Sequence, residues 1–492
     1  MRTAERRAGL LALILGLLHW WLAPDTGTDL AAQLARASFA RAAPLAPVDF
    51  SWYGGVHPFG YSLLSPWLMA LLGVQLCGLL AAVAGSVLLA RLLRDTPRPG
   101  LAALVGAVFV TADVASGRTT FALGAAVGLA ALCARTRRPA AAALAVATAL
   151  LSPVAAAFLG FAAAVMVLHR RVGGWTLGVA ATVPVVVLAV LFPGGGVQPY
   201  TTHSARPAVL AAIVVALLTG IPMVRTAALL YGLAVLAFLA HDDPFGSNVL
   251  RLGLLLSATV LLATARRRGL ITLVATIGIL SWQVGPTWGD LRAPAGPPLG
   301  ALRTELVSLH AQRVEVVAPR DHDESWYVAE KVNLARGWAR QQDYVLNPLF
   351  YKGTLTWSAY LDWLHEHAVD HVAVPRHAVL DFGSKREGAL WRGTASGGPG
   401  MVLAPVWQDD DWFVYAVPEP VPVAPGLLSS SRTELRLQLE PGTYAVHVRW
   451  SRWLSVHGSA CVERRGDDVQ LRVTRPGVVV LGSSLRPRHH CP

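Results

Sequence analysis

The sequence predicts a polytopic α-helical membrane protein that continues into a mostly soluble C-terminal region. Only 15% of the 492 residues are charged and the mean hydropathy is +0.47, whereas soluble globular proteins carry about 25% charged residues. The apolar residues gather in runs up to about residue 284, and the remainder alternates between apolar and polar residues. The charge divides at the same place. Up to Gln283 there are 20 Arg, no Lys and 8 Asp/Glu, and from Val284 onward there are 22 basic and 22 acidic residues.

We expect eleven membrane-spanning helices, although several apolar runs fall below the roughly 17 residues that a span usually needs. Short spans are tolerated where their backbone is buried in protein or lines a cavity. The expected spans are 8–23, 66–90, 100–113, 119–134, 139–150, 154–168, 174–192, 207–222, 226–240, 251–264 and 269–284. Ser152-Pro153 divides residues 139–168 into two spans, because the residue before a proline disfavours the helix. Trp20 and Trp21 end the first run as interfacial residues do, which favours a retained anchor over a cleaved signal peptide.

Arginine clusters predict the orientation of these spans. One set of connections, which includes Arg135–Arg138 and Arg266–Arg268, carries 15 Arg and two acids. The alternate set carries five Arg and six acids. Because cytoplasmic connections are enriched in Arg and Lys, we expect a plasma-membrane protein with a cytoplasmic N-terminus and an extracytoplasmic C-terminal domain. Arginines in short clusters between apolar runs fit this arrangement better than nucleic-acid binding, so we expect no nucleic-acid partner.

The first outer loop, residues 24–60, holds the acids that could carry chemistry. Asp29 precedes a predicted surface helix that begins at Leu30, so one interpretation of Asp29 is plain helix capping. The other interpretation is a carboxylate at the membrane edge that serves as a general base or holds a divalent metal, with Asp25 and Asp49 as rivals for either role. The loop ends in aromatic and turn residues that could line a pocket for donor or acceptor: Trp52, Tyr53, His57 and Tyr61.

Two other outer connections carry single arginines. Arg118 could bind a lipid phosphate, or it could be an interfacial arginine whose charge reaches up to water. Arg251 follows a turn that contains Asp243 and Asn248, and ionisable residues so close to a bilayer are candidates for function. The structural alternative is an Arg251–Asp243 ion pair.

The C-terminal half divides into three segments. Residues 285–300 are rich in Pro and Gly and are expected to form a linker. Residues 301–420 predict an α/β domain with strands at 313–319 and 371–375 and a helix at 358–368. Residues 421–492 alternate strictly and predict a β-rich, sandwich-like module, in which Pro441-Gly442 forms a turn. Cys461 and Cys491 lie in this module and are a candidate disulfide if it faces an oxidising compartment, with two free thiols as the alternative.

Several strings resemble actinobacterial multispanning membrane proteins of the GT-C glycosyltransferase superfamily. They are Trp52–Tyr61, Ser116–Gly124, Gly246–Arg251, Trp338–Asp343 and Asn347–Tyr351. The long acidic first outer loop and the outer C-terminal domain resemble the same superfamily. The resemblance implies a GT-C-like fold for residues 1–284 and transfer of a sugar from a polyprenyl-phosphate donor to a cell-envelope glycan, as in cell-wall biogenesis. It assigns the catalytic acid/base to Asp29. Under the hypothesis of sugar transfer, the donor phosphate would lie near Arg118 or Arg251.

The resemblance leaves the metal open. The family often shows adjacent acids in the first loop, whereas Asp25 and Asp29 are four residues apart. A divalent cation, Mg²⁺ or Mn²⁺, is therefore neither required nor excluded. Two other functions remain as alternatives: a transporter or lipid flippase, and a non-catalytic envelope-assembly protein whose tail binds glycan or protein. Membrane lipids are partners in every case.

Overall fold

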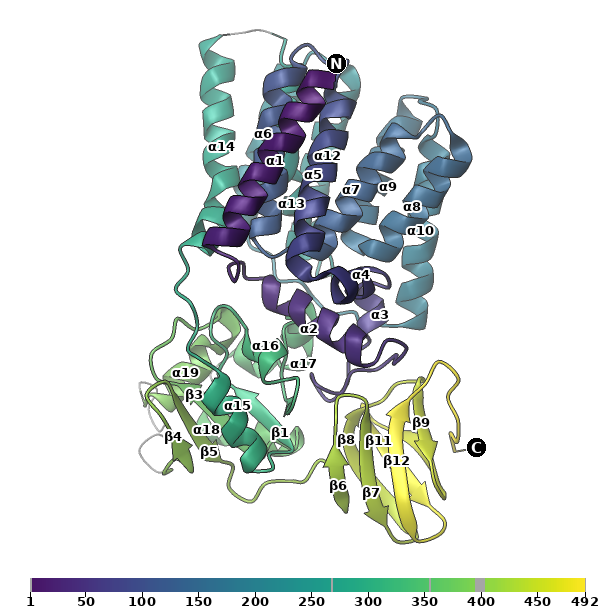
Figure 1. Ribbon diagram of the computed structural model, residues 1–492, viewed down its shortest axis with the longest axis vertical. Coiled ribbons are helices and arrows are strands. Elements are labelled where there is room, and N and C mark those ends of the chain that lie inside the picture. Colours follow the sequence, from purple (N-terminus) through teal and green to yellow (C-terminus); the bar gives the residue numbers. More distant parts are fainter. Residues whose placement is uncertain (1, 267–268, 354, 394–402, 492) are drawn as a thin grey trace. The chain divides into compact units, whose positions relative to one another are not determined.

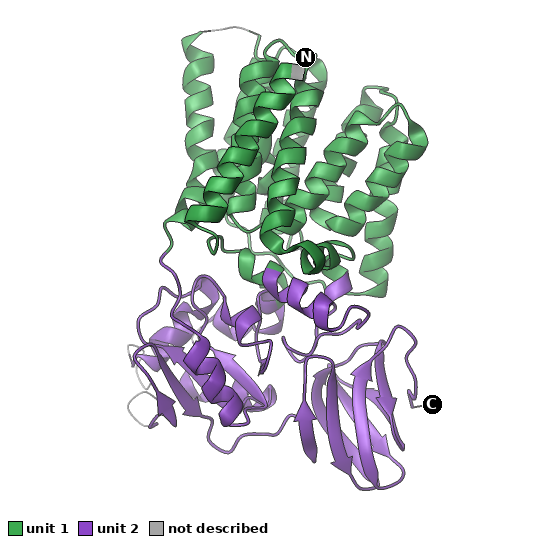
Figure 2. Cartoon of the chain, viewed as in Figure 1, with its two compact units in different colours: residues 1–33, 60–293, 340–342 green, residues 34–59, 294–339, 343–492 purple. Residues whose placement is uncertain are grey.

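The computed structural model describes residues 2–266, 269–353, 355–393 and 403–491, so that Arg267 and Arg268 of the expected cytoplasmic cluster lie outside the described residues. The chain forms two compact units, which Figure 2 distinguishes by colour. Unit 1 comprises residues 1–33, 60–293 and 340–342, and unit 2 comprises residues 34–59, 294–339 and 343–492. The segment 34–59, which the sequence places in the membrane half, therefore groups with the C-terminal region.

Unit 1 is a helical bundle (Figure 1). Its helices are α1 (Arg2–Leu22), α4 (Ser65–Leu72), α5 (Val74–Leu93), α6 (Pro99–Ala115), α7 (Thr119–Cys133), α8 (Arg138–Leu151), α9 (Pro153–Leu168), α10 (Gly174–Leu191), α11 (Thr202–Leu218), α12 (Pro222–Ala240), η1 (Gly246–Val249), α13 (Leu250–Thr264) and α14 (Leu270–Leu291). Three more helices cross the boundary between the units: α2 (Leu30–Ala42), α3 (Pro58–Tyr61) and α17 (Arg340–Leu346). α5 packs against α1, α6 and α7, and α6 also packs against α13.

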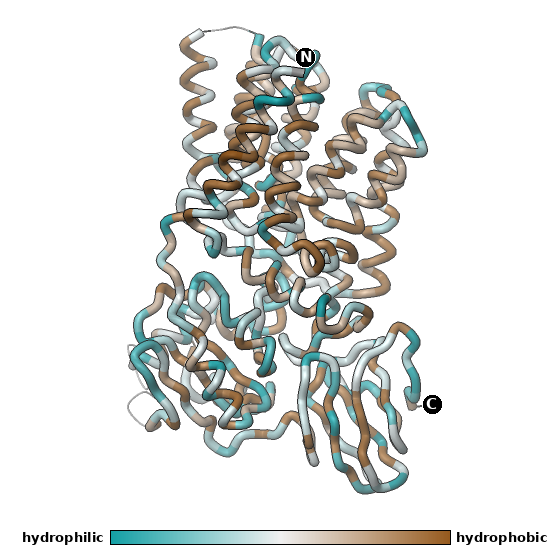
Figure 3. The backbone as a smooth tube through the Cα atoms, in the orientation of Figure 1, coloured by the Kyte–Doolittle hydropathy of each residue, from teal (hydrophilic) through white to brown (hydrophobic). Residues whose placement is uncertain are grey.

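Five segments of unit 1 are long and apolar enough to cross a membrane: α5, α10, α12, η1 with α13, and α14. Five shorter helices, α6, α7, α8, α9 and α11, are also apolar. Figure 3 shows that hydrophobic residues follow these helices along most of their length. On α14, Leu270, Ile271 and Val274 are at least 59% exposed within the chain, as residues that face lipid are. Each of the eleven expected segments is helical, and how many of them cross the membrane remains a prediction.

The structure corrects two expected boundaries. The segment 66–90 is not one helix, because Gly73 adopts a left-handed φ of 87° and separates α4 from α5. Glycine tolerates this conformation without the steric cost that other residues incur. The last helix, α14, continues to Leu291 past Pro286, so the expected linker at 285–300 shrinks to the residues before α15 (Gly300–Ser308). Ser152 does separate α8 from α9, and its hydroxyl accepts a hydrogen bond from the Ala155 N–H.

Unit 2 contains an α/β domain with a five-stranded sheet in the order β2-β1-β3-β5-β4. Its strands are β1 (Arg313–Val316), β2 (Asn333–Leu334), β3 (His371–Pro375), β4 (Trp407–Gln408) and β5 (Trp412–Ala416). The helices of this domain are α15, α16 (Glu324–Tyr327), η2 (Pro348–Phe350), α18 (Trp357–Glu366), η3 (Phe382–Ser384) and α19 (Lys385–Trp391). β1 is parallel to β2 and β3, and β5 is antiparallel to β3 and to the edge strand β4. The expected strands and helix of this domain are thus present.

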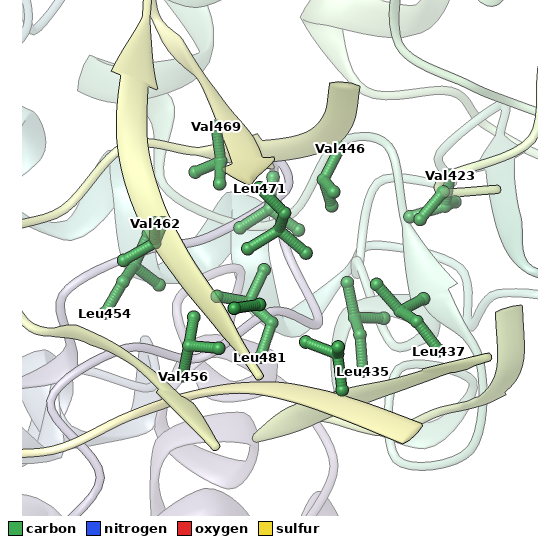
Figure 4. Close-up of a cluster of buried hydrophobic side chains, with 14 of the residues drawn as sticks. Val423, Leu435, Leu437, Val446, Leu454, Val456, Val462, Val469, Leu471 and Leu481 are labelled. Atoms are coloured by element: carbon green, nitrogen blue, oxygen red, sulfur yellow. The ribbon is translucent and has the colours of Figure 1, made fainter. Parts of the chain in front are cut away.

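The β-rich module of unit 2 is a sandwich of two antiparallel sheets, ordered β6-β7-β12-β9 and β10-β11-β8. Its strands are β6 (Leu427–Ser430), β7 (Glu434–Leu439), β8 (Gly442–Arg449), β9 (Leu454–His457), β10 (Ala460–Arg465), β11 (Asp468–Val473) and β12 (Gly477–Ser483). Alternate residues such as Leu435, Leu437, Val469 and Leu471 point inward and form the core (Figure 4). β7 and β8 lie in different sheets, so the turn at Pro441-Gly442 passes between the sheets and does not close a hairpin.

Candidate functional site

Two glycines bring the first loop of unit 1 against the turn that joins α6 to α7. Gly27 and Gly117 have φ values of 113° and 81°. A Cβ on Gly117 would lie 2.3 Å from the backbone N of Leu30, and one on Gly27 would lie 2.5 Å from the carbonyl carbon of Ser116. Only glycine permits this approach of two backbones. The Asp29 N–H donates to the Ser116 carbonyl across the same contact, which fixes Asp29 beside the turn.

Asp29 lies between two arginines. Its Oδ2 accepts from Arg118 Nε at 3.3 Å and from Arg251 Nη2 at 3.1 Å. Arg118 also donates through Nη1 to Asp113 at 3.2 Å. The four side chains are 11–28% exposed, so they lie at a partly buried surface where charge pairs are stronger than in water. The structure therefore brings together three residues that the sequence singled out, together with Asp113.

Other residues hold this cluster in place. Thr120 donates to Gln33 Oε1 at 2.5 Å, and the Gln33 amide donates to the Asp29 carbonyl at 3.3 Å. The guanidinium of Arg251 also lies 5.6 Å from the centre of the Phe121 ring. Gln33, Thr120 and Phe121 come from α2 and the first turn of α7. Sequence reasoning missed these residues and Asp113, although Asp113 lies only five residues before Arg118.

A small cleft adjoins the charged cluster. It is lined by Asp113 and Arg118, by the polar residues Gln283 and Thr287, and by Phe109, Ala112, Leu254, Leu255 and Pro286. Its volume of about 10 Å³ holds roughly one water molecule. A phosphate group at Arg118 would require the cleft to widen.

The rival acids have other surroundings. Asp25 is exposed, and no described residue forms an ion pair with it. Asp49 belongs to unit 2 and is 6% exposed. Its carboxylate accepts from the Ser51 backbone and hydroxyl and from Arg432 at 3.1 Å. Asp49 is therefore a buried structural acid of unit 2.

The aromatic residues expected to line a pocket are instead core residues of unit 2. Trp52 and Tyr53 are 5% and 4% exposed. Trp52 Nε1 donates to the Ser325 carbonyl, and the Tyr53 hydroxyl donates to the Gly337 carbonyl at 2.6 Å. Burial raises the pKa of Tyr53 well above its usual value. His57 Nε2 lies 2.8 Å from the Ser451 hydroxyl. Both side chains pack in a core cluster of unit 2 beside β2, and a role for them in a substrate pocket stays a prediction.

Asp243 and Asn248 shape the turn that leads into α13. Asp243 Oδ1 accepts from the N–H groups of Phe245 and Gly246, at 2.7 and 2.9 Å. The Asn248 amide donates to the Phe245 carbonyl. The alternative of an Arg251–Asp243 ion pair is not observed: Arg251 pairs with Asp29. Tyr61, the remaining predicted pocket residue, ends α3 and is half-buried.

Unit 2 contains a buried charged network that the sequence did not predict. Arg336 bonds to Glu315 at 2.7 Å and to Glu387 at 2.5 Å. The Tyr360 hydroxyl donates to Glu387 at 2.6 Å. Burial raises the pKa of both Glu315 and Glu387, and Arg336 only partly offsets this shift. The network is enclosed, and its hydrogen bonds join Arg336, Glu315, Glu387 and Tyr360, although Glu315 Oε2 has no partner among the described residues. We interpret it as structural.

Cys461 and Cys491 form a disulfide, which is the pairing that the sequence offered as a candidate. Cys77 and Cys133 are free thiols in unit 1. Within the described ranges, no group of three or more His, Cys, Asp or Glu residues is placed to hold a metal ion. At Asp29 the carboxylate oxygen faces two cations, which is not the donor set that Mg²⁺ or Mn²⁺ prefers. The residues of the cluster therefore do not fit a divalent metal.

Comparison with known proteins adds no family to this description. No protein-family model matches the chain, and no curated protein matches it either.

Proposed function

We propose that this protein is a membrane glycosyltransferase that uses a polyprenyl-phosphate sugar and acts at the outer face of the membrane. The proposal includes a GT-C-like arrangement of about eleven spans, a cytoplasmic N-terminus and an extracytoplasmic tail. The acceptor is a hydroxyl group of a cell-envelope glycan. The observation that carries the proposal is the cluster in which Asp29 bonds to both Arg118 and Arg251.

The cluster suggests how donor binding and base activation are linked. In this structure two guanidiniums bond to the same carboxylate oxygen of Asp29 and occupy it. A phosphate group offers each arginine a bidentate, charge-assisted partner. When the donor phosphate takes over the two guanidiniums, the Asp29 carboxylate is released from them and is free to accept a proton from the acceptor hydroxyl. Asp113 keeps its bond to Arg118 and orients it.

The transfer step then balances without a metal. Asp29 removes the proton from the acceptor hydroxyl, whose oxygen forms a bond to the anomeric carbon of the donor sugar. The bond from that carbon to the phosphate oxygen breaks, and the electron pair leaves with polyprenyl phosphate. Arg118 and Arg251 stabilise the charge that develops on the leaving phosphate. Attack opposite the leaving group inverts the anomeric centre.

The test compares Asp29→Asn with Asp25→Asn in membranes supplied with a panel of polyprenyl-phosphate pentoses and hexoses. General-base catalysis typically contributes about 10²–10⁴-fold, so Asp29→Asn should lower sugar release or transfer by that factor. Asp25→Asn removes a nearby exposed acid and should leave the rate unchanged. Equal expression and unchanged elution in size-exclusion chromatography control for folding. Full transfer by Asp29→Asn would refute the assignment.

The second candidate is a non-catalytic envelope-assembly protein. The same ion pairs favour it, because a carboxylate already neutralised by two arginines also serves as a structural tie between α2, α7 and α13. This alternative predicts that no donor in the panel is consumed and that Asp29→Asn lowers stability in place of activity.

A further inference from the structure

A second cavity of unit 1 lies on the opposite face of α6 from the charged cleft. The cleft is lined by Phe109, Ala112 and Asp113, whereas the second cavity is lined by Thr111 and Val114. Successive helical residues are rotated by about 100°, which places these two sets on opposite sides of the helix. Leu30 and Thr119 also line the second cavity, and they directly follow Asp29 and Arg118 in the chain. The candidate site thus has a charged cleft on one side and this cavity on the other.

Five polar and eight apolar residues line the second cavity, and none of them is Asp, Glu, Lys or Arg. Its polar lining consists of His19, Thr26, Gln75, Thr111 and Thr119. His19 Nε2 lies 3.1 Å from the Thr26 hydroxyl, and the Thr111 hydroxyl donates to the Ala107 carbonyl. These three side chains therefore already have partners inside the protein.

Gln75 and Thr119 differ from the other polar residues of the lining. Neither side chain forms a hydrogen bond with another described residue; Thr119 is 2% exposed and Gln75 is half-buried. The Gln75 amide and the Thr119 hydroxyl can therefore form hydrogen bonds with a ligand in the cavity, which suits a ligand with hydroxyl groups.

The rest of the lining indicates where that ligand resides. Gly16, Trp20, Leu30, Val74, Leu79, Ala82 and Val114 complete the wall, and Pro24 lies at its edge. They come mainly from α1, α5 and α6, and α5 is one of the helices long enough to cross a membrane. The volume of about 30 Å³ admits a hydroxymethyl group and not a whole sugar ring.

We propose that this cavity, here called the Gln75 cavity, binds an uncharged hydroxyl-bearing group of the acceptor, and that the acceptor is a lipid-borne glycan whose apolar part lies against α1 and α5. That this ligand is the acceptor of the reaction rests on the proposed glycosyl transfer. The binding itself requires no catalysis. No Arg or Lys lines this cavity, which distinguishes it from the arginine side, where a phosphate would bind.

The test uses the full chain in lipid nanodiscs and a decyl β-glucoside that carries a diazirine on the first carbons of its alkyl chain. The control probe is the same diazirine-labelled alkane without the sugar. Photolabelling by the glucoside should map to peptides of α1 and α5, and the alkane should not concentrate there. Loss of one hydrogen bond of about 1–1.4 kcal/mol corresponds to about fivefold to tenfold weaker labelling, which we expect for Gln75→Leu and for Thr119→Val.

Ser86→Ala is the matched control, because Ser86 is a buried polar residue of α5 that does not line the cavity. It should label as the unchanged protein does. The proposal is overturned if both probes label α1 and α5 equally, or if Gln75→Leu and Thr119→Val both label fully while remaining monodisperse. Asp29→Asn separates the two claims. It should keep full labelling while losing transfer, so retained transfer would count against the glycosyltransferase and not against the cavity.

Discussion

At the scale of single residues, the position of Asp29 depends on Gly27 and Gly117. Both have positive φ, and both are in contact with backbone atoms at distances that no Cβ allows. The carboxylate reaches Arg118 and Arg251 because these contacts hold the loop against the α6–α7 turn. This local backbone requirement is as important to the site as the charged side chains themselves.

A substitution at Gly117 tests this dependence. Gly117→Ala should cost about 1–3 kcal/mol through left-handed strain, and the clash with Leu30 adds to that cost. We expect lower thermal stability and a loss of any Asp29-dependent transfer. Gly278→Ala is the control, since nothing lies within 4 Å of its added Cβ and alanine favours the helix. Equal melting temperatures for the two variants would contradict this account of the turn.

His322 gives unit 2 a dependence on pH. Burial alone would lower its pKa, but Asp381 at 3.3 Å and Glu324 at 3.2 Å outweigh burial and raise it to about 9. Because the folded pKa lies above the unfolded value of about 6.5, the stabilisation is complete below pH 6.5 and is lost as the pH rises toward 9. The difference between the folded and unfolded pKa of His322 corresponds to a stabilisation on the order of 3 kcal/mol.

The free energy of unfolding of unit 2 can be measured by hydrogen exchange in the full chain at a series of pH values between 6 and 9.5. In the unchanged protein the stability of unit 2 should decline above pH 6.5, and we expect His322→Gln to remove much of that decline. His457→Gln changes an exposed histidine and should leave the decline intact. If His322→Gln and the unchanged protein lose stability in parallel, the ion pairs do not control the pH response.

At the scale of elements, the C-terminal segment closes the open side of the sandwich. The Val462 N–H donates to the His489 carbonyl, and the Val456 N–H donates to the Arg488 carbonyl. These bonds occupy the edges of β10 and β9, one from each sheet, where unpaired backbone groups would otherwise be exposed. The Cys461–Cys491 disulfide fixes the segment in place.

Removal of that disulfide should loosen one edge of the sandwich. The bond spans 30 residues, and chain-entropy arguments give a loss of about 3–4 kcal/mol for a loop of that length. In Cys491→Ser we expect faster hydrogen exchange at Val456 and Val462, with little change in β3. The double variant Cys461→Ser/Cys491→Ser controls for a reactive single thiol. Unchanged protection at both valines would show that backbone bonds alone hold the segment.

The elements that the sequence predicted best are those with a strong local pattern. β3 matches the expected 371–375, and β1 and α18 fall within a few residues of their expected ranges, because alternation and helical periodicity are local signals. Pro441-Gly442 also predicted a turn, but turn chemistry does not say which strands pair. β7 and β8 lie in different sheets, and no feature of the sequence indicated this.

The candidate site was predictable only in part. Asp29, Arg118 and Arg251 were candidates because they are charged residues close to an expected membrane surface. In the structure Asp29 forms ion pairs with both arginines. The sequence could not show that Arg251 bonds to Asp29 and not to Asp243, since the two partners are 222 residues apart. The sequence also could not show that Trp52 and Tyr53 are buried, because an aromatic cluster in a loop fits a pocket and a packed core equally well.

At the scale of the whole molecule, the chain combines a membrane-type helical unit with a second unit built around two β-sheets. The long first loop contributes residues 34–59 to the second unit, where Val48 and Phe50 are buried in the sandwich core. The second unit is therefore assembled from two distant parts of the sequence. A tail expressed without residues 34–59 would lack part of that core.

The central claim is that Asp29 and unit 2 act outside the cell while the arginine-rich turns remain in the cytoplasm. Single cysteines at exposed positions test it, introduced as Ser429→Cys in the sandwich and Thr136→Cys in an arginine-rich turn after Cys77 and Cys133 are replaced by alanine. With an impermeant maleimide on intact cells, we predict labelling of Ser429→Cys at once and of Thr136→Cys only after permeabilisation. Labelling of Thr136→Cys in intact cells, with Ser429→Cys protected, would contradict the claim.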